Sequence, residues 1–503
     1  MLKSVIDYLK NSLKKYSSKV AFQDEQKEVT YYEVNSYAER IATYIIEQGC
    51  YMNKNIPIGI FMEKGCDILV SFIGIAMSGN IYAPIDCNAP KERIRKIIDI
   101  LQPELIICDS KNYDLACSYF MATRVILYDN LCKNAVNHEM INESVRRICD
   151  TDPLYILFTS GSTGVPKGVL VNHRAVIDFT EEASEVMGFS DKERFCNQAP
   201  FFFDASIPDI YCTIRNGATL YIPDKKRFQF PVKILQYIKK HSINAFFWVP
   251  SALIIIANLN VLKEVDITCV KKVMFCGEVM PTKQYNIWKK ALPDALFVNY
   301  YGPCETTYAC TYYIIDREFK DDEPLPIGKP ALNTKIFILD GNEKISTKNT
   351  IGELCISGSC LAMGYYNNPE KTREKFVQNP LLEKYCEKIY RTGDLVTIND
   401  FGELMYVCRK DFQIKHMGYR IELEEIEMFA STVNGVDLAA CVYDPKCKQI
   451  CLFYQGETDN KRIMETLKEK LPVYMIPQRI KKMETMYMNS NGKIDRKRLA
   501  EEL

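Results

Sequence analysis

The sequence predicts an α/β protein with a large N-terminal domain (1–410) of mostly parallel sheets covered by helices, followed by a small, mobile α+β C-terminal domain (411–503). Three observations support this fold class. Apolar runs typical of buried strands alternate with helical periodicity in the first part of the chain, which indicates repeated β-α-β units. A hairpin near residue 400 then changes the pattern. Finally, 503 residues are too many for one simple core.

The predicted strands of the first part are short apolar runs. They cover 56–61, 81–84, 104–108, 124–129, 218–223, 245–250 and 271–277. Between the second and third runs, the apolar face of a helix is formed by Ile94, Ile97, Ile98 and Leu101. Pro103 ends that helix. Strand and helix therefore alternate as a parallel sheet requires.

The second part begins after a hairpin at 395–409, whose turn is predicted at 399–402. Two helices follow. Their apolar faces are Leu423, Ile426 and Ala430, then Ile463, Leu467 and Leu471. Acidic residues occupy the first turn of the former helix, where they suit the helix dipole.

Composition excludes several classes of protein. Lys+Arg and Asp+Glu balance at 64 each, so the charge favours neither a nucleic-acid partner nor an acidic membrane. The longest apolar stretch, near 68–77, is too short to cross a bilayer, and membrane insertion is not expected. The 20 cysteines form no CxxC pair, and the N-terminus has no signal-peptide core. We therefore expect a cytoplasmic protein with free thiols.

A loop of Ser, Thr and Gly follows a predicted buried strand at 155–158. The loop contains Lys167, but it fits neither the Walker A nor the Rossmann template. Small residues nevertheless let backbone N–H groups approach an anion, and the hydroxyls and the lysine add further donors. A solvated surface loop is the alternative interpretation.

Four other motifs accompany this loop: NYYGPCETT (299–307), YRTGDL (390–395), CRKDFQIKHMGYRIELEEIE (408–427) and NGKIDRKRL (491–499). Each is weak alone. In this order they closely resemble the adenylate-forming superfamily, which includes acyl-CoA synthetases, adenylation domains of nonribosomal peptide synthetases, luciferase, and D-alanine–D-alanyl carrier protein ligases. The resemblance covers nearly the whole chain.

The resemblance implies an ATP-dependent ligase with two half-reactions. A carboxylate attacks the α-phosphorus of ATP, giving an acyl-adenylate and pyrophosphate, and a thiol then displaces AMP. By the same resemblance Glu305 holds Mg²⁺, Arg409 assists at the ribose or phosphate, and Lys493 bridges the carboxylate and the α-phosphate. Asp411 is the implied hinge of the C-terminal domain, and Gly418 lines a pantetheine tunnel.

The implied ATP site draws on five stretches of the chain. Its members are Thr159, Ser160, Gly161, Ser162, Thr163, Gly164, Lys167, Asn299, Tyr300, Tyr301, Gly302, Pro303, Cys304, Asp394, Tyr406, Arg409 and Lys493. Tyr301 would stack on adenine, and Asp394 would bind the ribose hydroxyls. Cys304 stands where the family usually has threonine, so a hydroxyl contact to the α-phosphate is in doubt, because a thiol donates hydrogen bonds poorly.

The stretch APFFFDASIPDIY (199–211) resembles the substrate-binding stretch of members that activate amino acids. Asp204 matches the carboxylate that pairs with the α-ammonium group, although it could instead cap the following helix. The implied substrate site consists of Asp204, Ala205, Pro208, Met274, Cys276, Tyr300, Tyr308, Ala309 and Lys493. Two tyrosines and a methionine leave room for a small amino acid, although the tyrosines could also bind a polar side chain.

MFCGEVMP (274–281) and the stretch after the hinge look most like the D-alanyl carrier protein ligases. In that comparison Cys276 excludes one enantiomer of alanine, although it could be only a small buried hydrophobe. We expect D-alanine as substrate and the phosphopantetheine thiol of a separate carrier protein as acceptor, since no carrier motif follows. The alternatives are an acyl-CoA synthetase for a small carboxylic acid, a stand-alone adenylation enzyme for another amino acid, and a non-catalytic relative.

Overall fold

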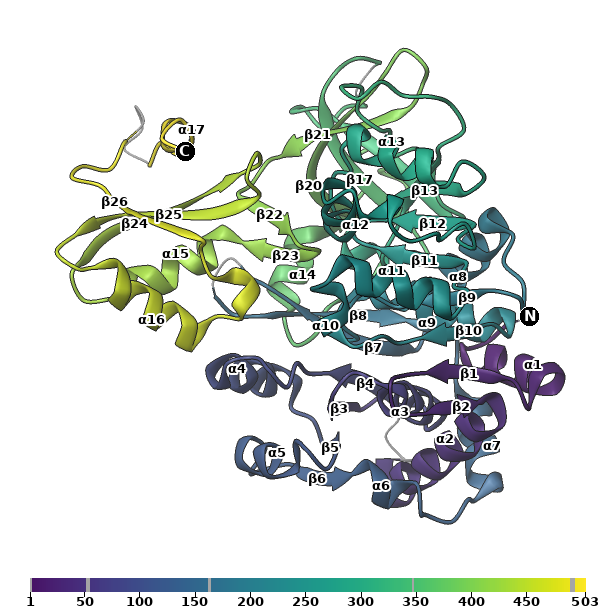
Figure 1. Cartoon of the computed structure of the whole chain (residues 1–503). Coiled ribbons are helices and arrows are strands. Elements are labelled where there is room, and N and C mark those ends of the chain that lie inside the picture. Colours follow the sequence, from purple (N-terminus) through teal and green to yellow (C-terminus); the bar gives the residue numbers. More distant parts are fainter. Residues whose placement is uncertain (1, 51–54, 162–163, 346–347, 489–493) are drawn as a thin grey trace.

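A computed structural model describes residues 2–50, 55–161, 164–345, 348–488 and 494–503. Most of the chain forms a large body built on three sheets (Figure 1). The elements after residue 411 form two further sheets at one side of that body, coloured yellow-green to yellow in Figure 1. The division at 410/411 remains a prediction of the sequence.

The first sheet has the order β15-β14-β13-β12-β11-β9-β10-β1-β2 and is parallel from β1 to β13. Its strands are β1 Val20–Gln23, β2 Glu28–Thr30, β9 Arg194–Cys196, β10 Thr219–Tyr221, β11 Ala245–Trp248, β12 Lys272–Phe275, β13 Leu296–Tyr301, β14 Thr311–Ile314 and β15 Lys329–Pro330. The runs predicted at 218–223, 245–250 and 271–277 thus belong to one parallel sheet, as β10, β11 and β12. Their carboxyl ends meet at one edge, where ligands bind in folds of this kind.

The second sheet, β18-β8-β7-β4-β3-β5-β6, is parallel except at β7, β8 and β18. Its strands are β3 Pro57–Phe61, β4 Ile81–Pro84, β5 Leu105–Cys108, β6 Arg124–Leu127, β7 Pro153–Thr159, β8 Lys167–Asn172 and β18 Gly364–Tyr365. The helix predicted at 94–101 is α4, Lys91–Leu101; it ends at Gln102, in the left-handed conformation, just before Pro103.

Helices cover both sheets and separate them. They are α1 Ile6–Tyr16, α2 Tyr31–Ile45, α3 Cys66–Met77, α4, α5 Tyr113–Tyr119, α6 Tyr128–Leu131, α7 His138–Arg147, α8 His173–Met187, α9 Ile207–Asn216, α10 Lys225–Phe228, α11 Pro231–Lys240, α12 Pro250–Asn258, α13 Thr282–Ala291 and α14 Pro369–Lys375, with short helices η1 Ile46–Cys50, η2 Asp204–Ser206, η3 Val261–Lys263 and η4 Cys304–Thr306. The main hydrophobic core joins α1, α2, α3, α8 and α9 to both sheets, so burial of apolar surface fixes the two sheets relative to each other.

The third sheet is antiparallel throughout, which the alternating pattern of the first part does not predict. Its strands are β16 Thr334–Leu339, β17 Gly352–Gly358, β19 Phe376–Gln378, β20 Lys388–Ile398 and β21 Leu404–Arg409. The hairpin predicted at 395–409 is the end of β20 with β21, and Gly402 closes its turn on the carbonyl of Asn399.

The C-terminal elements comprise a two-stranded hairpin and a second, three-stranded sheet among the described residues. They are β22 Gln413–His416, β23 Tyr419–Glu422, α15 Leu423–Ser431, β24 Val436–Asp444, β25 Gln449–Gly456, α16 Asn460–Lys470, η5 Val473–Met475, β26 Arg479–Lys482 and α17 Arg496–Ala500. The two helices predicted from apolar spacing are α15 and α16. Their apolar faces are buried in a core of their own.

Candidate active site

The Ser/Thr/Gly loop connects two antiparallel strands, β7 and β8, rather than a strand and a helix. Thr159 pairs with Lys167 in the register of these strands, so the loop and its lysine are fixed side by side. The hydroxyl of Thr159 is buried and has no hydrogen-bond partner among the described residues. A buried donor without a partner is suited to binding an anion. Ser162 and Thr163 lie outside the described residues.

The glycines of this loop are required by close approaches. A Cβ at Gly161 would lie 2.1 Å from the carbonyl oxygen of Val165. Gly164 has a φ of +67°, and a Cβ there would lie 2.1 Å from the end of the Met428 side chain, on α15. The loop is therefore packed tightly against the C-terminal helix, and a freely solvated surface loop is excluded.

Lys167 is buried, and its ammonium group lies 3.0 Å from the carboxylate of Glu422 at the end of β23. Burial lowers the pKa of Lys167, and the neighbouring Arg420 guanidinium lowers it further. Ser160 is bound to the same strand, because its hydroxyl donates to the carbonyl of Arg420 (2.6 Å) and accepts from the amide of Glu422 (3.2 Å). The C-terminal hairpin thus occupies the polar groups predicted to bind phosphates.

Glu305, the predicted magnesium ligand, lies in η4 and is completely buried. Tyr365 donates its phenol to one carboxylate oxygen (2.6 Å), and Arg420 approaches the other at 2.5 Å. Burial alone would raise the pKa of Glu305, but Arg420 and Lys167 lower it to about 2. The carboxylate is therefore ionised at every physiological pH.

The hairpin β22–β23 enters the site through a two-residue turn of Met417 and Gly418, both with positive φ. A Cβ at Gly418 would lie 2.7 Å from the Val249 side chain, so only glycine fits without a shift. The amide of Gly418 donates to Glu278 at 3.0 Å. Lys415, on the same hairpin, reaches the carbonyl of Gly302 at 3.4 Å.

The residues predicted for the nucleoside form a connected chain of polar contacts. Tyr301 donates to Asp394 (2.5 Å), and Arg409 binds the other oxygen of Asp394 at 2.8 Å. Arg409 also binds Asp411, the predicted hinge, with two hydrogen bonds of 2.6 and 2.7 Å. Because Asp394 and Arg409 are register partners of β20 and β21, the hairpin predicted from sequence holds this network together. Tyr406 comes from the same pair of strands.

The other predicted adenine-side residue, Asn299, is buried and donates its amide to the carbonyl of Pro326 at 2.8 Å. Gly302 and Pro303 follow β13 and lead into η4. A Cβ at Gly302 would lie 2.6 Å from the backbone of the segment at Ala309, so glycine is required there. Cys304 is buried, and its thiol faces Asp204.

Asp204 lies in η2, and its half-buried side chain has no ion pair in the described parts of the chain. Burial raises the pKa of Asp204, although Lys415 opposes the shift. The helix that follows, α9, has Ser206 as its N-cap, so Asp204 is not the cap of that helix. A carboxylate in this setting is suited to an incoming cation.

Tyr308 stands in a strained turn beside Asp204. Its φ is +73°, and the amide of Ala309 bonds back to the carbonyl of Thr307 at 3.0 Å, which defines a γ-turn. Such conformations are rare for bulky residues and cluster at functional sites. The ring of Tyr308 packs edge-on against Phe179 (5.4 Å between centroids) and Phe247 (6.4 Å).

The remaining predicted pocket residues gather in the same core. These are Ala205, Met274, Cys276, Tyr300 and Ala309. Pro208 is buried on α9. Cys276 is buried, and burial raises the pKa of its thiol to about 12, so it stays protonated. Its sulfur lies 3.8 Å from the carbonyl oxygen of Tyr308. This position is compatible with both interpretations of Cys276: a side chain that excludes one enantiomer by steric contact, and a small buried residue that only packs in the core.

Sequence reasoning missed several residues that the structure brings to the site. Arg420 and Glu422 lie in a quoted motif but received no role, and Tyr365 lies in no motif singled out above. The ring of Phe247, inside the strand predicted at 245–250, lies 6.2 Å from the ring of Tyr300. Its place at the carboxyl end of β11 was the one available signal.

The donor set fits ATP, because the hydroxyls of Thr159 and Ser160 and the ammonium of Lys167 belong to one loop and its flanking strands. For magnesium the chain offers Glu305, and the described residues contain no group of three His, Cys, Asp or Glu side chains that could hold an ion by themselves. A single carboxylate fits a Mg²⁺ ion that is shared with substrate phosphates. Lys493, the predicted bridging lysine, lies outside the described residues.

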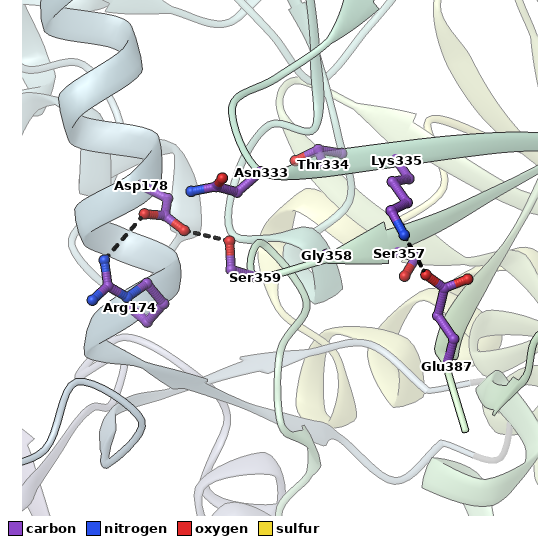
Figure 2. A pocket seen from close by; sticks show the side chains of 9 residues that line it. All are labelled: Arg174, Asp178, Asn333, Thr334, Lys335, Ser357, Gly358, Ser359 and Glu387. Carbon is purple, nitrogen blue, oxygen red and sulfur yellow. Dashed lines mark hydrogen bonds and ion pairs between the residues drawn. The ribbon is translucent and has the colours of Figure 1, made fainter. Parts of the chain in front are cut away.

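A separate surface cavity of about 620 Å³ lies between α8 and the antiparallel sheet (Figure 2). Its charged groups are paired with one another: Arg174 and Ser359 bind Asp178, and Lys335 binds Glu387 at 2.7 Å. None of the predicted site residues lines it. Because its charged groups pair with one another, we assign no catalytic or binding role to this cavity.

A protein-family profile described as "AMP-binding enzyme" matches residues 9–366 of the chain. The chain is 30% identical to a D-alanine–D-alanyl carrier protein ligase of Bacillus cytotoxicus, and the match covers 96% of each chain. It is also 30% identical to gramicidin S synthase 1 of Brevibacillus brevis over 99% of this chain and 44% of that protein. The chain thus spans less than half the length of this last relative.

Among solved structures, the Vibrio cholerae adenylation domain AlmE in complex with glycyl-adenosine-5'-phosphate superposes with a TM-score of 0.87. The identity is 21%, and the match covers 100% of this chain and 98% of that one. At 21% sequence identity, the structural similarity shows a shared fold. Within the described ranges, no helix has the length and apolar character needed to cross a bilayer.

Proposed function

The chain belongs to the AMP-binding enzyme family of ATP-dependent, AMP-forming ligases, and we propose that it activates a small amino acid, D-alanine as first candidate, as its aminoacyl-adenylate. The activated amino acid then passes to the phosphopantetheine thiol of a separate carrier protein. The relative from Bacillus cytotoxicus carries this pairing of D-alanine and carrier protein in its name.

The observation that carries the proposal is the state of Asp204. Its carboxylate is half-buried, burial raises its pKa, and no ion pair compensates its charge within the described residues. Holding an uncompensated carboxylate in such surroundings is costly unless a cation arrives. The α-ammonium of an amino acid is a cation of suitable size. An acyl-CoA synthetase for a simple carboxylic acid has no use for this charge.

The size of the substrate is limited by aromatic side chains. The ring centroids of Phe179 and Phe247 each lie 5.4 to 6.4 Å from those of Tyr300 and Tyr308. All four rings are buried in the main core. If Asp204 binds the α-ammonium group of the substrate, the buried rings leave little space for the substrate's side chain. We therefore favour glycine or alanine over larger amino acids.

The polar groups fit the two half-reactions. Thr159, Ser160 and Lys167 would bind the phosphates, and Glu305 would hold Mg²⁺, which neutralises charge as the phosphoanhydride breaks. A rotation about the predicted hinge, Asp411, would bring Lys493 to the reacting carboxylate. In the structure the hairpin turn lies at Val249 instead. We propose that this is the position for thioester formation, in which Gly418 would lie beside the pantetheine arm.

ATP–pyrophosphate exchange over D- and L-amino acids and small carboxylates tests the proposal. Exchange with D-alanine well above L-alanine supports the first candidate, and exchange with acetate or propionate alone overturns the amino-acid assignment. The acceptor is tested separately with a phosphopantetheinylated carrier protein and with free CoA. A preference for CoA would overturn the carrier-protein assignment.

A second candidate substrate is a small amino acid with a polar side chain, such as serine. The phenol of Tyr300 is buried and has no hydrogen-bond partner in the structure. A side-chain hydroxyl of the substrate could satisfy it, since a buried polar atom without a partner costs about 1–3 kcal/mol. Exchange with serine that drops in Tyr300→Phe, while exchange with alanine does not, would favour this candidate.

A further inference from the structure

Two charged side chains contact the loop 197–203, which connects β9 to η2, and neither has a role in the site described above. One is Lys64, in the connection between β3 and α3, which donates to the backbone carbonyls of Asn197 (3.5 Å) and Gln198 (3.3 Å). Its ammonium group also lies 5.6 Å from the centre of the Phe201 ring, within the range of a cation–π contact. One side chain of the second sheet thus contacts three residues of a loop that belongs to the first sheet.

The other is Asp209, which reaches the beginning of the same loop from α9. Its side chain is completely buried, and one carboxylate oxygen accepts from the side-chain amide of Asn197 at 2.7 Å. The other oxygen has no hydrogen-bond partner among the described residues. Burial raises the pKa of Asp209 to about 8, although the hydrogen bond from Asn197 and the charge of Lys64 oppose this shift. Asn197 is therefore fixed by its backbone through Lys64 and by its side chain through Asp209.

We infer that Lys64 and Asp209 are positioning residues for the amino-acid end of the site, because they fix the loop that sets the place of the Asp204 carboxylate. The inference rests on the function proposed above, in which Asp204 binds the α-ammonium group of the substrate. The two residues act through the loop and touch neither substrate. Their loss should therefore weaken the binding of the amino acid without weakening the binding of ATP.

The loop is short enough to transmit a displacement from its beginning to its end. β9 ends at Cys196, and η2 begins at Asp204. Between them, the amide of Phe203 bonds to the carbonyl of Pro200 at 3.1 Å, and the amide of Ser206 bonds to the carbonyl of Phe203 at 3.1 Å. These turns connect the fixed part of the loop to Asp204. A misplacement of about 1 Å in a binding group is enough to lower activity by about a hundredfold.

Steady-state pyrophosphate exchange on the full chain, with the amino acid that the wild type activates best, tests the inference. Lys64→Met keeps the length of the side chain and removes its donors, so it should raise the KM for the amino acid about tenfold. The KM for ATP should stay within about twofold of wild type. Lys64→Arg restores a donor and a charge and should bring the amino-acid KM back to within about threefold of wild type. The matched control is Lys225→Met, which removes an exposed lysine whose charge also acts on Lys64, and it should behave as wild type does.

Hydrogen exchange gives a readout that does not depend on turnover. In Lys64→Met and in Asp209→Leu, the amides of the loop 197–203 should exchange about tenfold faster than in wild type, whereas those of α4 should be unchanged. Asp209→Leu leaves the ammonium group of Lys64 without its counter-charge and the amide of Asn197 without its acceptor. If this variant fails to fold, Lys64→Met alone decides the test.

The inference and the proposed function fail in different ways. An amino-acid KM that is unchanged in Lys64→Met overturns the inference, and so does an equal rise in the KM for both substrates. A raised amino-acid KM without faster exchange in the loop 197–203 also overturns it, because the effect would then not act through the loop. Each of these results leaves the proposed function intact. A wild-type protein that activates no amino acid overturns both.

Discussion

The two ends of the candidate site hold their carboxylates in opposite ways. At the phosphate end, Glu305 is fully buried but paired with Arg420 and Tyr365, and its pKa lies near 2 despite burial. At the amino-acid end, Asp204 is only half-buried, yet it has no ion pair among the described residues, and burial raises its pKa. The protein itself supplies a cation to Glu305, whereas the proposed cation for Asp204 is the α-ammonium group of the substrate.

This difference separates an ion pair that stabilises the free protein from a carboxylate that is available to bind a ligand. A buried ion pair that is complete stabilises the arrangement in which it forms, and removing one partner is strongly unfavourable. An unpaired carboxylate weakens the free protein but strengthens binding of a cationic ligand. Such a trade between stability and function is common at active sites.

The largest expected effect comes from removing the unpaired charge. Asp204→Asn should lower kcat/KM for the amino acid by about a hundredfold, because the α-ammonium loses a charged, half-buried partner worth about 3 kcal/mol. The KM for ATP should stay within about twofold, since Asp204 is not among the phosphate contacts. Steady-state pyrophosphate exchange measures both. Equal loss for ATP and amino acid would show that Asp204 supports the whole site instead.

The comparison predicts opposite effects on stability from two similar substitutions. Glu305→Gln should lower the free energy of unfolding by about 3 kcal/mol at pH 7, because it leaves Arg420 buried without a countercharge. Asp204→Asn should raise it by about 1 kcal/mol, because it removes a carboxylate held without a partner. Thermal unfolding should therefore rank Asp204→Asn above wild type and wild type above Glu305→Gln. The reverse order would contradict the charge assignment at both ends.

Cys276→Ala tests whether the thiol excludes one enantiomer of alanine by steric contact. If the thiol rejects one enantiomer, its removal should narrow the preference for D- over L-alanine by about tenfold, mainly by improving exchange with L-alanine. Exchange rates with the two enantiomers, measured on wild type and variant, give the ratio directly. An unchanged ratio with normal activity would leave Cys276 as a buried packing residue.

The smallest expected effect is a pH dependence of the difference in unfolding free energy between wild type and Asp204→Asn. Because the pKa of Asp204 is raised on folding, its ionised form destabilises the protein, and that penalty is complete at neutral pH. The penalty disappears as the pH falls through the folded pKa toward the unfolded value of about 3.9, where both states are protonated. The advantage of about 1 kcal/mol in Asp204→Asn should therefore shrink between neutral pH and pH 4. Unfolding midpoints of the two proteins across this range test it, and a constant difference would contradict the raised pKa.

The sequence by itself determined the local elements of this protein. Apolar runs and helical spacing located β3, β4, β5, α4 and the hairpin of β20 and β21, because burial on one face of a strand or helix leaves a period in the sequence. The motifs also identified the family, which the profile match to residues 9–366 shows. The role of the Ser/Thr/Gly loop in binding phosphates stays a prediction. These signals are short-range, so a single chain segment carries each of them.

Only the tertiary structure decided which charged groups meet. Lys167 and Glu422 are 255 positions apart, and Arg420 and Glu305 are 115 apart, so no local pattern links them. The antiparallel pairing of β7 with β8 and the approach of Phe247 to Tyr300 were equally invisible. The physical reason is that a side chain's partner depends on how whole sheets and the C-terminal hairpin pack together, and the free energy of that packing is spread over the entire core.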